Sequence, residues 1–212
     1  MLSTIDAIEA RRSIPRLAEP GPNGTELRAM IRAAAAAPDH GKCRPWRFVV
    51  VPKQSADDFG AVLERAYIRR CELAGDDVDE ARRERERTRL RRAPMFVVVV
   101  CQPRTDCNIP LHEQQAAVAA ATQNFLLAAT SMGYGSMWAT GAAATDPHVK
   151  EALQLGPDDS IVGFLYLGSV PAGREARPPH REAEVSGVVR TWFPSTGSLP
   201  EVPFASVQGL RC

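Results

Sequence analysis

The chain has 212 residues, 44% of them hydrophobic, and no Gly/Ser-rich linker divides it, so one domain with a substantial core is expected. Its 26 basic and 25 acidic side chains nearly cancel, which leaves no global field to gather nucleic acid or anionic lipid. A small-molecule partner fits this balance better. The longest apolar run, residues 93–101, is too short to span a bilayer, and residues 1–10 lack a signal-like apolar segment. A cytoplasmic protein without a membrane partner is therefore expected.

The cysteines do not form a recognisable framework. They are odd in number and widely spaced, and no C-x-x-C pair occurs among Cys43, Cys71, Cys101, Cys107 and Cys212. Neither a disulfide scaffold nor a zinc site is indicated, and reduced thiols are expected.

Helices and strands alternate along the chain. A first helix, capped by Ser3 or Thr4 and carrying Ile5 and Ile8 among its apolar positions, is expected to end near residue 11. A second helix should open at residue 25 or 26 and stop at Pro38. Further helices are expected over residues 55–70 and 113–132, in the charged segment before residue 92, and after a cap at Asp146. Strands are expected over residues 46–51, 95–101, 134–138 and 161–167.

Two of these elements have informative compositions. Residues 95–101 form a β-branched run typical of a central strand that is covered on both faces. The helix over residues 113–132 is apolar nearly all the way round, so it should be buried on every side, partly by a second subunit.

The first candidate binding motif is Arg11-Arg12-Ser13, at the end of the first helix. Two cations and a hydroxyl at one place suit a phosphate group. The alternative is that the arginines only complement the dipole of the helix C-terminus.

Two further motifs accompany it. Pro38-Asp39-His40 leads through a loop into the first strand, where His40 could serve a ligand or be a solvated loop histidine. The segment 133–141 is a Gly-bounded strand that contains Trp138, Ala139 and Thr140, and its alternative interpretation is an ordinary strand.

Together these motifs resemble the FMN-dependent nitroreductase family, and most closely its compact bacterial subgroup with a Pro-Asp-His loop. The resemblance covers residues 5–193. It implies an α+β three-layer sandwich, with a mostly antiparallel central sheet flanked by helices, in an intertwined homodimer. The corresponding division is a nitroreductase-like FMN-binding domain over residues 1–193 and a C-terminal tail over residues 194–212.

The resemblance also implies roles for the site residues. Arg11 and Ser13 would contact the FMN phosphate, with Arg12 along the ribityl chain or the ring edge. Pro38, Asp39 and His40 would reach the flavin of the other subunit. The remaining implied contacts to FMN come from Trp138, Ala139 and Thr140 at the ring, and from Arg177, which matches the late basic residues loosely.

Two departures from the commoner family pattern stand out. Many relatives place Lys or Arg two residues after the serine, near flavin N1, whereas this chain has Pro15 there and Arg16 one position later. Lys42 and Arg44 replace an Asn and a Gln of other relatives. That change adds positive charge at the pocket mouth, which suits anionic substrates or the phosphates of a nicotinamide donor.

The implied function is an NAD(P)H-dependent FMN oxidoreductase that reduces nitroaromatic, quinone or similar electron-poor acceptors by ping-pong hydride transfer, with NADH or NADPH as the donor. No side chain is required as a catalytic acid or base, and no metal is expected. One alternative is a flavin-binding protein of the same fold that stores, senses or breaks down FMN. Another is a nucleic-acid accessory protein acting through the arginine-rich segment 82–92. Acids that precede this segment, such as Asp79 four residues before Arg83, favour an exposed, ion-paired helix instead.

Overall fold

The computed structural model describes residues 2–173, all within one compact unit of the chain. Over these residues it contains one four-stranded sheet in the order β1-β2-β4-β3, in which every neighbouring pair is antiparallel. The strands are β1 (Trp46–Val51), β2 (Met95–Cys101), β3 (Tyr134–Ala139) and β4 (Ser160–Ser169). The expected α+β fold with an antiparallel sheet is confirmed.

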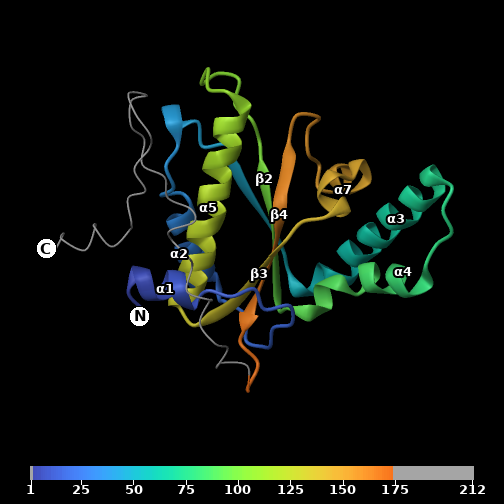
Figure 1. Ribbon diagram of the computed structural model, residues 1–212, viewed down its shortest axis with the longest axis horizontal. Helices are drawn as coiled ribbons and strands as arrows, with labels where there is room; N and C mark the ends of the chain where they lie inside the picture. Colours follow the sequence, from blue (N-terminus) through green and yellow to red (C-terminus); the bar gives the residue numbers. More distant parts are fainter. Residues whose placement is uncertain (1, 174–212) are drawn as a thin grey trace, which may run out of the picture. The chain divides into compact units, whose positions relative to one another are not determined.

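Helices cover both faces of the sheet. One face carries α1 (Thr4–Ala10), α2 (Gly24–Ala34) and α5 (Leu111–Ser131), and the other α3 (Ala56–Ala74), α4 (Glu80–Arg87), α6 (Ala142–Thr145) and α7 (Pro147–Ala152) (Figure 1). Short 3₁₀ turns are η1 (His40–Lys42), η2 (Lys53–Ser55) and η3 (Arg89–Arg92). No helix among residues 2–173 is long and apolar enough to cross a membrane.

Side-chain caps fix where the helices begin. Ser3 caps α1 in a reciprocal pair with Asp6, as expected from the sequence. The second helix begins slightly earlier than predicted, because Asn23 accepts hydrogen bonds from the backbone of residues 25 and 26. Asp146 caps α7 as predicted.

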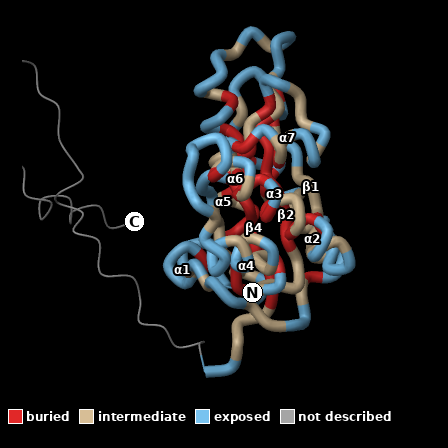
Figure 2. The backbone as a smooth tube through the Cα atoms, turned by 90° about the vertical axis from the view of Figure 1, so that its right-hand side faces the viewer, coloured by how far each residue is buried: buried red, intermediate tan, exposed pale blue. Residues whose placement is uncertain are grey.

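The central position predicted for residues 95–101 is confirmed. Val97 and Val99 of β2 pack toward α2 and α5, and Val98 and Val100 pack toward α3, all with 0% exposure. Figure 2 shows buried backbone concentrated along β2 and β4. Because β2 is covered on both faces, its sequence is continuously apolar and does not alternate.

Two helices of the layer formed by α1, α2 and α5 are only partly buried within one chain, although burial on every side, partly by a second subunit, was expected for residues 113–132. On α1 only Ala7 is buried, whereas Ile5 and Ile8 are 62% and 44% exposed. On α5 the sheet-facing side is buried, but Ala116 is exposed and Leu127 is half-buried. Apolar side chains thus remain on the outer surface of this helical layer.

The charged segment folds back onto α3. As expected, α4 contributes no buried residue. The anticipated pair of Asp79 with Arg83 is not the one formed, because Asp79 caps α4 and Arg83 donates to Glu64 of α3 at 2.7 Å.

Candidate functional site

The N-terminal motif lies along the edge strand β3. Ser13 pairs with Ser136 in a parallel bridge, and the amide of Ile14 donates to the carbonyl of Ser136 at 2.9 Å. Arg12 donates to the carbonyl of Arg11 at 2.8 Å and to that of Glu9, so it satisfies carbonyls at the end of α1. In this conformation Arg12 therefore stabilises the C-terminus of α1, as the structural alternative held. Ser13 is exposed.

One buried hydroxyl beside this motif has no partner. The Oγ of Ser136 is fully buried and makes no hydrogen bond within residues 2–173. An unsatisfied buried hydroxyl costs about 1–3 kcal/mol, so the unpaired hydroxyl of Ser136 beside the motif needs an explanation. Because the Ser136 hydroxyl is not accessible from the surface, Ser13, which is exposed, is the hydroxyl of this segment that a bound phosphate could reach.

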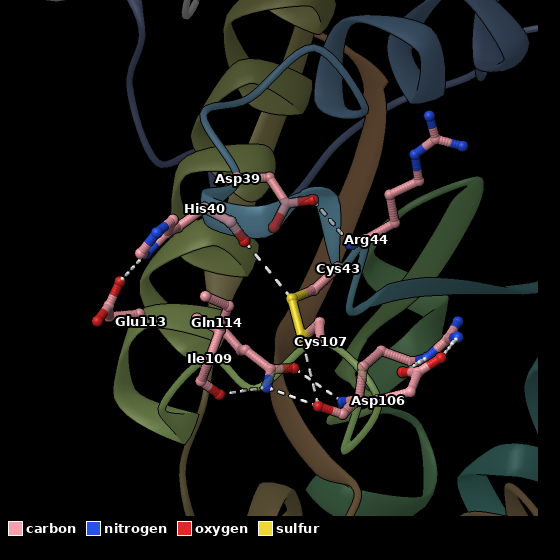
Figure 3. The surroundings of a disulfide bond; sticks show 10 residues. Asp39, His40, Cys43, Arg44, Asp106, Cys107, Ile109, Glu113 and Gln114 are labelled. Carbon is pink, nitrogen blue, oxygen red and sulfur yellow. Dashed lines mark hydrogen bonds and ion pairs between the residues drawn. A yellow bond between two sulfur atoms is a disulfide. The ribbon is translucent and has the colours of Figure 1, made fainter.

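The Pro-Asp-His loop is held by its own side chains. Asp39 accepts a hydrogen bond from the backbone amide of Arg44 at 2.7 Å, which closes the turn. The His40 ring lies 2.7 Å from Glu113 in the first turn of α5, and 69% of the His40 side chain is exposed (Figure 3). Pro38 is exposed just before the turn. The loop thus presents His40 outward from a rigid base.

A disulfide reinforces that base and corrects the expectation of reduced thiols. Cys43, three residues after His40, is bonded to Cys107 in the loop before α5 (Figure 3). Gln114, only 3% exposed, holds the second loop by bonding the backbone of Arg104 and Ile109. The two cysteines are 64 residues apart, so only the fold brings them together. Cys71 and Cys101 are free and buried.

The two motif groups lie at opposite ends of α5. His40 sits beside Glu113 near the start of this helix, whereas Ser13 is bound to Ser136, just beyond its end. Figure 1 likewise places α1 beside the C-terminal end of α5. The 18 residue steps from position 113 to 131 correspond to about 27 Å of helix. Within one chain the two groups therefore lie about the length of α5 apart.

A pocket of about 300 Å³ opens at the end of β3. Ala139 and Thr140, which the resemblance assigned to the flavin ring, line this pocket together with Met137. The indole of Trp138 lies on the opposite face, in the core with α5, where its Nε1 donates to the carbonyl of Val162 at 3.3 Å. Strand alternation explains this split, and it was also the signal by which Met137 could have been found.

Arginines from α3, α4 and η3 form the other wall of the pocket, and sequence reasoning did not assign them to the site. The best-held is Arg89, whose Nε donates to the hydroxyl of Tyr166 at 2.8 Å and whose other nitrogens reach Glu86 at 3.2 Å and the carbonyl of Thr140 at 3.4 Å. Burial raises the pKa of Tyr166 despite the neighbouring cation, so its phenol stays neutral. Burial acts to lower the pKa of Arg89, but Tyr166 and Glu86 outweigh it and the pKa is raised. Arg89 is a permanent, fixed cation beside Thr140.

Arg177 and residues 194–212, to which the sequence assigned a phosphate contact and a tail, lie outside the described residues. Among residues 2–173, no group of three or more His, Cys, Asp or Glu side chains could hold a metal ion.

The fold and the site define a class of α+β proteins in which a basic N-terminal motif runs along the edge strand of a helix-covered antiparallel sheet. The chain belongs to the Nitroreductase family, whose family model matches residues 8–169. It is 39% identical over 168 residues to "Putative NAD(P)H nitroreductase YdjA" of Escherichia coli, covering 78% of this chain and 88% of that one.

Solved structures share the fold. A nitroreductase-family protein of Desulfovibrio desulfuricans, solved in complex with FMN, superposes with a TM-score of 0.67 at 22% identity, covering 92% of this chain and 99% of that chain. An FMN and NADPH-dependent nitroreductase, NfnB, superposes with a TM-score of 0.70 at 18% identity, covering 90% and 99%. At these identities the likeness establishes the fold.

Proposed function

We propose that the protein is an NAD(P)H-dependent FMN oxidoreductase that reduces nitroaromatic, quinone or similar electron-poor acceptors by a ping-pong scheme. The observation that carries the proposal is the N-terminal basic motif bound along β3, the strand whose end lines the pocket, in a chain of the Nitroreductase family. Bound FMN would supply the hydride chemistry, accepting a hydride from the nicotinamide and passing it to the acceptor. NADH and NADPH both remain candidate donors.

The residues present suit this cofactor. Arg11 and Ser13 would bind the phosphate, with Arg12 close to the ribityl chain. Ala139 and Met137 offer an apolar wall to a planar ring, and Thr140 offers a hydroxyl and backbone groups at its edge. Trp138 would act mainly through its backbone and by anchoring β3. Its indole packs directly over Gly163, so closely that a Cβ added at Gly163 would lie 2.0 Å from the indole nitrogen. Arg177 is retained as a proposed phosphate contact.

We also propose a homodimer with FMN at the subunit interface. Because the Pro-Asp-His loop and the Arg11–Ser13 motif lie at opposite ends of α5, Pro38, Asp39 and His40 would serve the flavin of the second copy. The exposed Ile5 and Ile8 of α1 supply apolar surface for such a contact. This arrangement would exclude water from the ring, which lets fixed charges act more strongly on the reaction.

An absorption spectrum of the purified protein, followed by analysis of the flavin released on denaturation, tests the cofactor. About one FMN per subunit is expected, and release of FAD would contradict the proposal. Steady oxidation of NADH or NADPH with a nitroaromatic or quinone, giving parallel double-reciprocal lines, tests the reaction. Bound FMN without such turnover would instead favour a storage, sensing or flavin-degrading role. Salt-dependent binding to plain duplex DNA without flavin would favour the nucleic-acid alternative.

The phosphate contact is tested by Arg11→Ala. We expect it to weaken FMN retention by about 1.5–3 kcal/mol, the range for a hydrogen bond to a charged group. Fluorescence titration of the FMN-free protein measures this change, and an unchanged affinity would remove Arg11 from the site.

A further inference from the structure

The two faces of α4 are electrostatically different. On one face, Arg83 and Arg87 donate to the two oxygens of Glu64 at 2.7 and 2.8 Å, and Arg83 also bonds Glu80. These cations are neutralised by carboxylates from α3 and α4. On this side the arginines of α4 hold it against α3 through ion pairs.

The face of α4 toward β3 lacks this balance. Arg82 lies over the ring of Tyr67 at 5.0 Å. Asp79 is the nearby carboxylate: backbone hydrogen bonds from α4 and the charges of Arg85 and Arg82 lower its pKa. Neither arginine side chain, however, forms a hydrogen bond or ion pair with a carboxylate within residues 2–173. Both line the pocket that contains Thr140. The single acid of that pocket wall, Glu86, already bonds Arg89.

Arginines also gather around a second hollow, where Arg91 is paired with Asp57 at 2.9 Å but Arg16, Arg85 and Arg92 have no such carboxylate bond within residues 2–173. This pocket, of about 440 Å³, shares Arg85 and Arg92 with the first and is also lined by Arg16. Arg92 stacks at 5.7 Å over Tyr166. Like charges gathered around a partly enclosed space repel one another, and a bound anion would remove that cost. In a chain whose net charge is only +1, this local excess is a specific feature.

We propose that Arg82, Arg85 and Arg92 bind the anionic group, a phosphate or a carboxylate, of the substrate that exchanges hydride at the flavin. The inference rests on the proposed function. Guanidinium groups bind both anions in a bidentate manner and stay charged at every physiological pH. The pocket is suited to this role because its arginines face Ala139 and Thr140, the wall assigned to the ring, while the phosphate of FMN is assigned to Arg11 and Ser13. The anion comes either from the nucleotide donor or from an acidic acceptor.

Direct binding is tested first, without turnover. Inorganic pyrophosphate is titrated by calorimetry into wild-type protein, the double variant Arg82→Gln/Arg85→Gln, and the control Arg65→Gln. Arg65 is exposed on α3 and lines neither pocket, so the control removes the same kind of charge elsewhere. We expect at least about tenfold weaker binding in the double variant, as for the loss of charged hydrogen bonds, and wild-type binding in the control. Equal affinity in all three proteins would overturn the proposal.

Half-reactions then distinguish the two sources. Reduction is followed by stopped flow with NADPH and with reduced nicotinamide riboside, which carries no phosphate. Reoxidation is followed with 4-nitrobenzoate and with 4-nitrobenzamide. If the donor supplies the anion, the double variant lowers the NADPH-to-riboside rate ratio at least about tenfold, and if the acceptor does, it lowers the benzoate-to-benzamide ratio. Unchanged ratios in both pairs would overturn the proposal.

Retention of FMN provides a further check. If the double variant loses FMN while the control keeps it, the pocket holds the cofactor's own phosphate and the proposal is wrong. If the wild-type protein carries no flavin but binds pyrophosphate through Arg82 and Arg85, the proposed function fails while the anion site stands. The two failures are therefore distinguishable.

Discussion

Arg16 is the residue at which the N-terminal motif departs from the commoner family pattern, and the structure places it in a pocket with Arg85 and Arg92. Its backbone follows directly from the segment that is bound to β3, so the side chain starts close to the motif. We propose that this cation, in spite of Pro15, serves the part of the flavin that becomes anionic on reduction.

Replacing this cation should lower the reduction potential of bound FMN. The oxidised ring is neutral and the reduced ring is anionic, so Arg16→Ala would remove stabilisation from the reduced form only. A loss of about 1.4 kcal/mol corresponds to roughly 30 mV for this two-electron couple. Equilibration with a reference dye measures the shift, with Arg65→Ala as the control. A wild-type potential in Arg16→Ala would show that another group balances the reduced ring.

Glu64 should make the stability of the protein depend on acid pH. Hydrogen bonds from Arg83 and then Arg87 hold the pKa of Glu64 below its ordinary value, against the effect of its burial. The unfolded state therefore binds the proton more readily. This contribution is fully present above about pH 4.3, the ordinary glutamate pKa, and is lost as the pH falls further through the lowered pKa of the folded state.

Accordingly, Glu64→Gln should lower the free energy of unfolding at pH 7 by about 1 kcal/mol, since the pair is partly screened by solvent. The same variant should flatten the acid limb of the stability curve below about pH 4.3. Urea unfolding at several pH values measures both effects. Glu84→Gln, at an exposed position of α4, serves as the control. If the stability of Glu64→Gln fell with pH below about 4.3 as steeply as that of the wild-type protein, the acid dependence would not come from Glu64.

Candidate site residues could be identified from sequence where they lie together in one short segment. Ala139 and Thr140 were expected at the flavin from the family resemblance of segment 133–141, and the structure places both at one pocket, which does not itself test a flavin contact. Arg82 and Arg85 were interpreted as an exposed charged face, because nothing in their local pattern shows that α4 folds back toward the end of β3. Such placement depends on tertiary contacts, which a helical period cannot reveal.

At the scale of elements, patterning predicted the strands closely and the disulfide not at all. The β-branched composition of β2 predicts burial on both faces, and the predicted bounds of β1 agree with the structure. Cys43 and Cys107 carry no such local signal, because their pairing depends on two loops that meet only in the folded chain. The disulfide ties η1 to the segment before α5, and thereby positions the loop that presents His40.

Reduction of this bond should destabilise the protein by about 2–5 kcal/mol, as expected when a loop of this length is released in the unfolded state. Because the loop that carries His40 would also loosen, FMN retention should fall. Unfolding in urea with and without dithiothreitol measures the first effect, and flavin fluorescence measures the second. In the double variant Cys43→Ser/Cys107→Ser the reductant should change neither quantity. An equal response of this variant would assign the effect to other thiols.

At the scale of the whole molecule, the apolar character of α5 indicated a buried helix, but a single chain does not cover all of it. The outer surface of its layer exposes Ile5, Ile8 and Ala116. The sequence could not show that α1 places its isoleucines outward, since its short apolar pattern fits burial against either the same chain or a second copy. The proposed dimer would account for both the exposed apolar surface and the separation of the two motif groups.

Ile8→Lys should therefore weaken the dimer and the flavin site together. Ile8 is 44% exposed in the single chain, so a lysine can be accommodated there without disturbing the core. In a dimer interface the same change would remove about 1.5–3 kcal/mol of apolar burial and add a charge that must lose water. We expect at least about tenfold weaker association in sedimentation equilibrium, a wild-type circular dichroism spectrum, and loss of FMN at concentrations where the variant is monomeric. Leu73→Lys is the matched control, since Leu73 is 87% exposed on α3, on the opposite side of the sheet. A fully dimeric Ile8→Lys variant that retains FMN would place the interface elsewhere, and a wild-type monomer that binds FMN would exclude the shared site.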